Sequence, residues 1–166
     1  MTAQPGEQMR PEPQFVERGA FLVAGIYVRE TGQPGEIAQV WDQRFLPRLG
    51  ELGIDFTKGA VLYGVIRPVK DGKPGEFEYL AAAEVSSLDS LPVGMTGWEV
   101  PARTYAVFVA NDVGDLDPTF EYYHNVWLPR SDFLGVDEGP WLEVYPEDFG
   151  QTKLIHVYCP VRPRPS

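Results

Sequence analysis

The chain has 166 residues, the length of one domain, and a net charge of −10. An acidic surface repels phosphate backbones, so this composition argues against direct binding of nucleic acid. The single cysteine, Cys159, excludes an intramolecular disulfide. No apolar run is long enough to cross a membrane, and the N-terminus has no signal-peptide pattern, so we expect a cytoplasmic protein with no membrane partner.

Both ends of the chain are polar and rich in proline. Residues 1–14 are predicted to form a disordered tail, and residues 162–166 a short tail after the last strand. Residues 15–161 remain as a single domain.

The first half of this domain, residues 16–85, is predicted to fold as strand, helix, strand and strand. A mostly apolar run at 16–28 is typical of one long strand. From Glu36 to Leu52, apolar residues recur every three or four positions, which indicates one face of a helix. Two strands follow, joined by a turn rich in glycine and proline, at 60–69 and 76–85.

The second half, residues 100–161, repeats this order. Its helix is predicted to start with Asp117 as N-cap and Pro118 at the first helical position. A short edge strand, Gly97–Val100, is expected between the halves. The pattern predicts an α+β domain, with a mostly antiparallel sheet and two helices on one face. The elements of this half are a strand at 103–110, a helix at 117–128, and strands at 141–145 and 153–161.

One short sequence motif occurs twice in the chain. The segments 45–55 and 127–137 share six of eleven residues at an offset of 82, including the triplet Leu-Pro-Arg. A residue before proline disfavours the α conformation, so Leu46 and Leu128 are expected to mark kinks or ends of helices. The match predicts an internal repeat of residues 16–85 and 100–161, related by a pseudo-two-fold axis. A groove between the two modules is the natural place for a ligand.

The second half resembles a known family of domains. The segments "LPVGMTGWEVPARTYAVFV", "PWLEVYPEDF" and "KLIHVYCPV", between Gly94 and Pro160, resemble the GyrI-like effector-binding domain of AraC- and BmrR-type regulators. The resemblance implies two modules around a cleft that binds amphipathic, often cationic molecules. It also implies a buried acidic residue at the floor of the cleft, which maps to Glu143. The loop 110–117 departs from the family pattern, because it is longer and more acidic.

The residues around Glu143 fit such a site. Alternate side chains of a strand share a face, so Trp141, Glu143 and Tyr145 are expected to point into the cleft, with Leu142 and Val144 toward the helices. A carboxylate attracts a cation, and aromatic faces add cation–π attraction. Further aromatic residues are predicted to line the cleft, although core packing remains an equal or better interpretation for several of them: Tyr63, Phe21, Tyr27, Trp98, Tyr123 and Trp127. Trp41 and Phe45 have the same helical spacing and are expected in the core.

Three functions are consistent with the sequence. The first is the binding of amphipathic, cationic or planar aromatic small molecules, without a cofactor or metal. The second, implied by enzymes among the stand-alone relatives, is hydrolysis of cyclopropane-bearing alkylating natural products. Glu143 would then activate water, and Tyr105 or Tyr145 would donate a proton. The third, also implied by the resemblance to stand-alone relatives, is an interaction protein that protects DNA gyrase, with gyrase or a regulator as partner. No sequence pattern indicates an oligomeric state.

Overall fold

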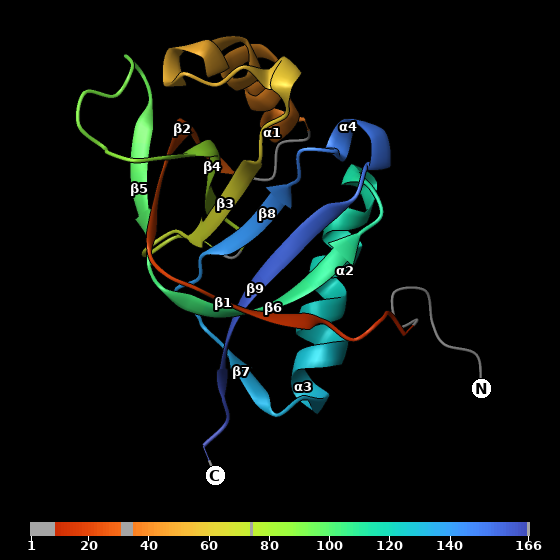
Figure 1. The fold of residues 1–166 in the computed structure, drawn as a ribbon. Helices are drawn as coiled ribbons and strands as arrows, with labels where there is room; N and C mark the ends of the chain where they lie inside the picture. The colour runs from red at the N-terminus through yellow and green to blue at the C-terminus, as the bar shows by residue number, and fades with distance from the viewer. Residues whose placement is uncertain (1–8, 31–34, 74, 166) are drawn as a thin grey trace.

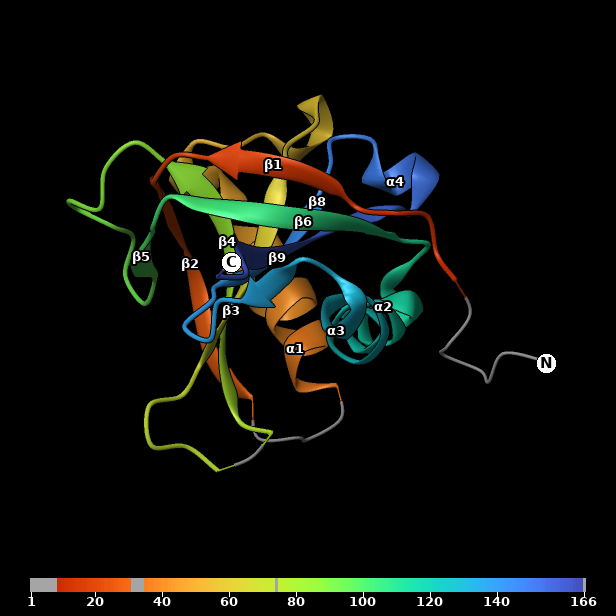
Figure 2. The ribbon, with the colours of Figure 1, turned by 90° about the horizontal axis from the view of Figure 1, so that it is seen from below.

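The computed structural model describes residues 9–30, 35–73 and 75–165 of the chain. Its strands form one antiparallel sheet, and two helical runs lie together on one face of that sheet (Figures 1 and 2). The α+β fold expected from the sequence is therefore confirmed.

The first half follows the order strand, helical run, strand and strand, and the second half has the same order with one additional short strand, β7, after its helical run. The first half consists of β2 (Phe21–Glu30), a helical run of α1 (Glu36–Gln39), η1 (Val40–Phe45) and η2 (Leu46–Leu52), then η3 (Phe56–Lys58), β3 (Leu62–Pro68) and β4 (Phe77–Val85). The second half consists of β6 (Arg103–Ala110), a helical run of η4 (Val113–Asp115), α2 (Leu116–Tyr122), η5 (Tyr123–Trp127) and α3 (Leu128–Arg130), then β7 (Phe133–Gly135), β8 (Trp141–Tyr145), α4 (Phe149–Thr152) and β9 (Ile155–Pro163). A further strand precedes each half, β1 (Gln14–Arg18) and β5 (Thr96–Val100).

The strand order shows that the sheet curls on itself. It runs β1–β6–β9–β8–β3–β4–β2–β5, with β7 paired to β9. Only Gly19 and Ala20 separate β1 from β2, yet β1 forms one edge of the sheet and β2 lies next to the other. This link spans at most roughly 11 Å between the Cα atoms of Arg18 and Phe21, so the two edges approach each other. The face turned away from the helices therefore encloses an interior.

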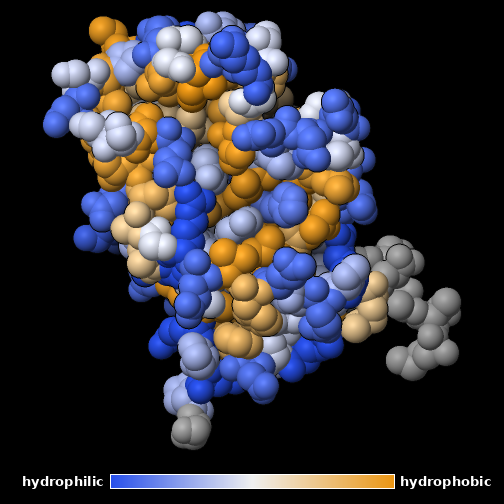
Figure 3. Space-filling view, in the orientation of Figure 1, coloured by the Kyte–Doolittle hydropathy of each residue, from blue (hydrophilic) through white to orange (hydrophobic). Residues whose placement is uncertain are grey.

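The described residues form three buried apolar clusters. One packs the first helical run against the sheet around Phe45 and Tyr79, and another packs the second helical run around Phe108 and Trp127. The third, the interior cluster, fills the inside of the curled sheet and contains Phe21, Val23, Tyr63, Val65, Leu80, Ala82, Trp98, Val100, Tyr105, Val107 and Leu142. Figure 3 shows the molecule in the orientation of Figure 1, where hydrophobic residues reach the surface between hydrophilic ones.

Each Leu-Pro-Arg triplet begins a new segment of a helical run, directly after a π-helical turn, η1 or η5. Leu46 and Leu128 both keep α-helical dihedral angles, so the expectation that they leave this conformation was wrong. A proline lacks the N–H and crowds the carbonyl of the preceding turn, and a wider π turn relieves that crowding. The internal repeat itself stays a prediction.

Two predicted boundaries differ in the structure. The single strand expected at 16–28 is divided into β1 and β2 at Gly19 and Ala20, because the two strands pair at opposite sides of the sheet. The second helical run has Asp115, not Asp117, at the N-cap position of α2.

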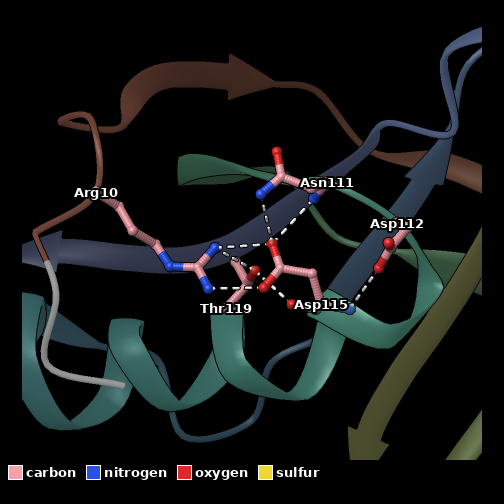
Figure 4. Close-up of polar contacts among 5 residues, drawn as sticks. All are labelled: Arg10, Asn111, Asp112, Asp115 and Thr119. Carbon is pink, nitrogen blue, oxygen red and sulfur yellow. Dashed lines mark hydrogen bonds and ion pairs between the residues drawn. The ribbon is translucent and has the colours of Figure 1, made fainter. Parts of the chain in front are cut away.

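The N-terminal boundary was predicted too late. Gln14 already belongs to β1, and Arg10 forms a two-pronged ion pair with Asp115, with N–O distances of 2.8 and 3.0 Å (Figure 4). Arg10 also donates to the Thr119 hydroxyl at 2.8 Å, so this segment is fastened to α2. The remaining residues of the predicted tail, 1–8, lie outside the described residues.

The C-terminal boundary was predicted too early. β9 continues to Pro163, and the Arg164 side chain donates to the carbonyl oxygens of Ser131 and Leu128. Arg164 thus closes the end of the second helical run, where carbonyl groups lack partners within the helix. Ser166 lies outside the described residues.

Candidate functional site

The candidate site lies on the face of the sheet that carries the helical runs. The first run contacts β2 and β4, and the second contacts β6 and β9, so the central strands β3 and β8 lie between them. Glu143 is the middle residue of β8, and only 7% of it is exposed. A buried carboxylate thus stands at the junction of the two halves.

Two tyrosine hydroxyls hold this carboxylate by the same oxygen. Tyr79 donates to Glu143 Oε1 at 2.7 Å, and Tyr145 donates to it at 2.9 Å. The indole N–H of Trp41 donates to the Tyr79 hydroxyl at 2.8 Å, which orients that hydroxyl toward Glu143. Among the described residues no group donates to Glu143 Oε2. One oxygen is therefore fixed, and the other is free for a partner from outside.

Gly64 on β3 makes room for this arrangement. It pairs with Glu143 across the strands, so a side chain at this position would point to the same face. A Cβ built on Gly64 would lie 2.5 Å from Glu143 Oε1 and still closer to the Tyr79 hydroxyl. A glycine in the interior of a strand often marks such a close approach.

Burial sets the charge behaviour of Glu143. It raises the pKa of the carboxyl above its usual value, and the negative charge of Asp117 adds to the increase. The hydrogen bonds from Tyr79 and Tyr145 act in the opposite direction, because they stabilise the carboxylate. Burial also raises the pKa of Tyr79 and of Tyr145, so both remain protonated donors. A positive charge brought to Oε2 would favour the ionised form.

Aromatic rings surround the carboxylate. The rings of Trp41 and Tyr145 meet edge to face at 5.2 Å, and Phe149 packs on Tyr145 at 5.1 Å. Tyr145 packs against both helix-side clusters, which places it between the two halves. Trp141 is half-buried on the same face of β8, with His124 at 6.3 Å, and burial lowers the pKa of His124. Aromatic faces beside a carboxylate suit an organic cation.

The structure places Trp141, Glu143 and Tyr145 on one face of β8, but it reverses the predicted side. These three residues face the helical runs, and Leu142 belongs to the interior cluster. The reason is the curl of the sheet, since the face without helices is closed on itself and needs the apolar side chains.

Five predicted site residues, four expected to line the cleft and one expected to donate a proton, do not join Glu143. They lie on the interior side of the sheet, where four belong to the interior cluster and the fifth packs against it. Tyr105 is fully buried there and its hydroxyl makes no hydrogen bond within the described residues, so it is not placed as a proton donor beside Glu143. The five residues are Phe21, Tyr63, Trp98, Tyr105 and Tyr27.

Tyr123 and Trp127 also lie away from the carboxylate. Both are buried beneath the second helical run, as the core interpretation of the sequence expected. The Tyr123 hydroxyl donates to the carbonyl of Pro160, and the Trp127 indole donates to Glu12. Tyr79 was not predicted as a site residue, and Trp41 was expected in the core. The feature of the sequence that could have indicated a site here is Gly64, a glycine in the middle of an apolar strand.

Other described residues line two further cavities. One, of about 180 Å³, includes Arg67, Trp98 and Arg103, and the other, of about 470 Å³, includes Tyr63 and the loop 53–61. Neither of these cavities is lined by Glu143. Within the described ranges, no group of His, Cys, Asp or Glu is arranged to hold a metal, and no helix is long and apolar enough to cross a membrane.

A curled antiparallel sheet with two helical runs on one face is the fold of this chain, and the chain matches the model of an effector-binding family. The chain belongs to the Cass2 family of integron-associated effector binding proteins, whose model matches residues 14–161. The resemblance to GyrI-like effector-binding domains is confirmed by this match.

Individual relatives share the fold over most of the chain. The structure of SAV2435 bound to tetraphenylphosphonium has a TM-score of 0.71 and 16% identity, covering 91% of this chain and 94% of that one. The Vibrio cholerae integron cassette protein VCH_CASS2 has a TM-score of 0.62 and 15% identity, covering 92% and 97%. The transcriptional regulator BrlR of Pseudomonas aeruginosa is 37% identical over 95 residues, which are 57% of this chain and 33% of BrlR. The chain thus matches about a third of that regulator's length.

Proposed function

We propose that the protein binds amphipathic small molecules with a positive charge, and that Glu143 recognises the charge. The observation that carries this proposal is the state of the Glu143 carboxylate. Two tyrosines fix Oε1, while Oε2 has no partner among the described residues. Because Glu143 is largely buried, a cation at Oε2 would interact with a carboxylate that little water screens.

The surroundings support an aromatic ligand. Trp41, Tyr145 and Phe149 offer ring faces and edges next to the carboxylate. Cation–π attraction is worth about 0.5–2 kcal/mol per ring. A fold neighbour was solved with tetraphenylphosphonium, an aromatic cation of this kind. The net charge of −10 also attracts cations.

Calorimetry with two matched ligands tests the proposal. Tetraphenylphosphonium carries the charge, and triphenylphosphine oxide is a neutral aromatic analogue. In Glu143→Gln we expect the cation to bind about 30-fold or more weakly, since losing one partner of a buried charge pair costs about 2–5 kcal/mol. The neutral ligand should change little. Glu121→Gln, an exposed carboxylate on α2, is the control. Equal losses for both ligands would reject Glu143 as the charge-recognising group.

Hydrolysis remains a second candidate, because burial raises the pKa of Glu143 toward that of a general base. Its proton donor would have to be Tyr145, since Tyr105 lies on the interior side of the sheet. Tyr145 already donates to Glu143, which favours binding over turnover. Recovery of a cyclopropane-bearing substrate unchanged after tight binding would reject hydrolysis. The gyrase-protecting role and the cytoplasmic location stay predictions.

A further inference from the structure

We propose a second binding site, for small organic carboxylates, at the mouth of the curled sheet. It is the cavity of about 180 Å³ lined by two arginines and a tryptophan, Arg67, Arg103 and Trp98. It opens on the interior side of the sheet and shares no lining residue with the Glu143 site.

Strand alternation brings the three side chains to this face. Arg67 follows Tyr63 and Val65 at alternate positions of β3, and both of these belong to the interior cluster. Arg103 likewise precedes Tyr105 by two residues on β6. The guanidinium groups of Arg67 and Arg103 therefore lie at the edge of the interior cluster.

Contacts within the protein hold both guanidiniums in place and leave some of their N–H donors unused. Arg67 stacks on the ring of Trp98 at 3.7 Å, and its Nε donates to Glu78 at 2.9 Å. Arg103 Nε donates to the carbonyl of Gly139 at 3.1 Å. In the part of the chain that the structure describes, the terminal nitrogens of Arg67 make no hydrogen bond. A carboxylate matches such a planar fork with two parallel hydrogen bonds.

The remaining walls define the body of the ligand. Val65, Val100, Pro101 and Pro140 are apolar, so a hydrocarbon group fits beside the charged end. The volume is below the roughly 300–1,000 Å³ of drug-sized sites, which limits the ligand to a small acid. Glu99 and Glu138 also line the mouth, but both are exposed and make no ion pair within the described residues, so they can turn to solvent. The arginines are the ordered charges.

Three planar probes of nearly equal shape test the site: benzoate, neutral benzamide and cationic benzamidine. Nitrogen-proton correlation spectra of the full chain would follow the Trp98 indole N–H, assigned through Trp98→Phe. We expect benzoate to shift this signal with saturation and benzamide to leave it unchanged. Arg67→Gln and Arg103→Gln should each weaken benzoate about tenfold or more, as expected for a lost charged hydrogen bond.

Controls separate this site from the proposed cation site. Arg29→Gln removes an exposed arginine that pairs with Glu76, and Glu143→Gln alters the other site; both should bind benzoate as the wild type does. Melting curves show whether each variant is folded. Arg67→Lys keeps the positive charge but loses the planar guanidinium, so its affinity for benzoate should lie between those of the wild type and Arg67→Gln. The proposal is overturned if benzoate gives no saturable shift, if the shift survives both arginine variants, or if benzamidine moves the Trp98 signal more than benzoate. Tetraphenylphosphonium binding is measured separately, so either proposal can fail alone.

Discussion

The Tyr79 hydroxyl donates a 2.7 Å hydrogen bond to Glu143 Oε1 across 64 residues of sequence. Tyr79 lies on β4 in the first half and Glu143 on β8 in the second. The bond therefore joins the two halves at the floor of the candidate site.

Removing the Tyr79 hydroxyl should damage both stability and binding. In Tyr79→Phe, the Trp41 indole loses its acceptor and Glu143 loses one of two donors. Leaving buried polar groups without partners costs about 1–3 kcal/mol, and we expect this loss of unfolding free energy in urea titrations. Cation affinity at neutral pH should also fall, because the lost bond stabilised the ionised carboxyl.

Tyr105→Phe is the matched control for that variant. Tyr105 is equally buried, but its hydroxyl has no hydrogen-bond partner among the described residues. Its removal should leave stability unchanged or slightly increased. If the two variants are destabilised alike, the hydrogen bonds around Glu143 are not what stabilises the floor.

Filling the gap at Gly64 should disrupt the same floor. In Gly64→Ala, the new methyl group would collide with Tyr79 and Glu143, both buried and unable to move freely. Overpacking of this kind costs about 1–3 kcal/mol. We expect lower stability and weaker tetraphenylphosphonium binding, measured by urea titration and calorimetry.

Gly50→Ala is the control, because a Cβ at Gly50 meets nothing within 4 Å and the residue lies in the helical segment η2. This substitution should leave the free energy of unfolding unchanged or raise it by up to about 1 kcal/mol. Full retention of cation binding in Gly64→Ala would show that the close approach at Gly64 is not needed.

The sequence predicted Glu143 and its two neighbours on β8 because alternation along a strand is a local property. It placed them on the wrong face because the curl of the sheet depends on which distant strands pair. The links after β1 and β5 are only two residues long, which indicates that the sheet curls, but this can be recognised only once the strand pairing is known. Local spacing also found both helical runs. The proline rule marked where each run changes its helix type, although Leu46 and Leu128 keep helical dihedral angles.

Tyr79 and Trp41 could not be assigned in the same way. Tyr79 lies in an alternating strand whose neighbours give no hint of a carboxylate, and it meets Glu143 only through strand pairing. Trp41 has the spacing of a core residue, and only the geometry shows its indole N–H bonded to Tyr79. Side-chain networks between distant strands therefore cannot be predicted from the residue pattern of each strand alone.

The ion pair between Arg10 and Asp115 should stabilise the fold. The Arg10 side chain is 23% exposed and that of Asp115 17%, and the Arg10 guanidinium lowers the pKa of Asp115. We expect Arg10→Gln to lower the unfolding free energy by about 1–2 kcal/mol, as for hydrogen bonds to a charged group. Arg29→Gln, which removes a half-exposed pair, should change the unfolding free energy much less than Arg10→Gln does.

The same pair has a defined pH dependence. Because the folded pKa of Asp115 is depressed, the stabilisation is present above its unfolded pKa and is lost as pH falls through the folded value. The difference between wild type and Arg10→Gln should therefore shrink in acid. A difference that is constant down to acid pH would mean that Arg10 acts through packing and not through charge.

Glu143 should give the opposite pH dependence, and it links stability to binding. Its folded pKa is raised, mainly by burial, so the folded protein holds a proton there more tightly than the unfolded chain does. The resulting stabilisation is full below the unfolded pKa and is lost as pH rises through the folded pKa. Tetraphenylphosphonium requires the carboxylate, so its affinity should rise with pH over this window, by up to about tenfold per unit.

Calorimetry in buffers of different ionisation enthalpy should show proton release on binding within the window and none above it. Glu143→Gln should abolish the release and flatten the affinity profile. An affinity that does not change with pH in the wild type would mean that Glu143 is ionised before the cation arrives, and that burial is offset by Tyr79 and Tyr145.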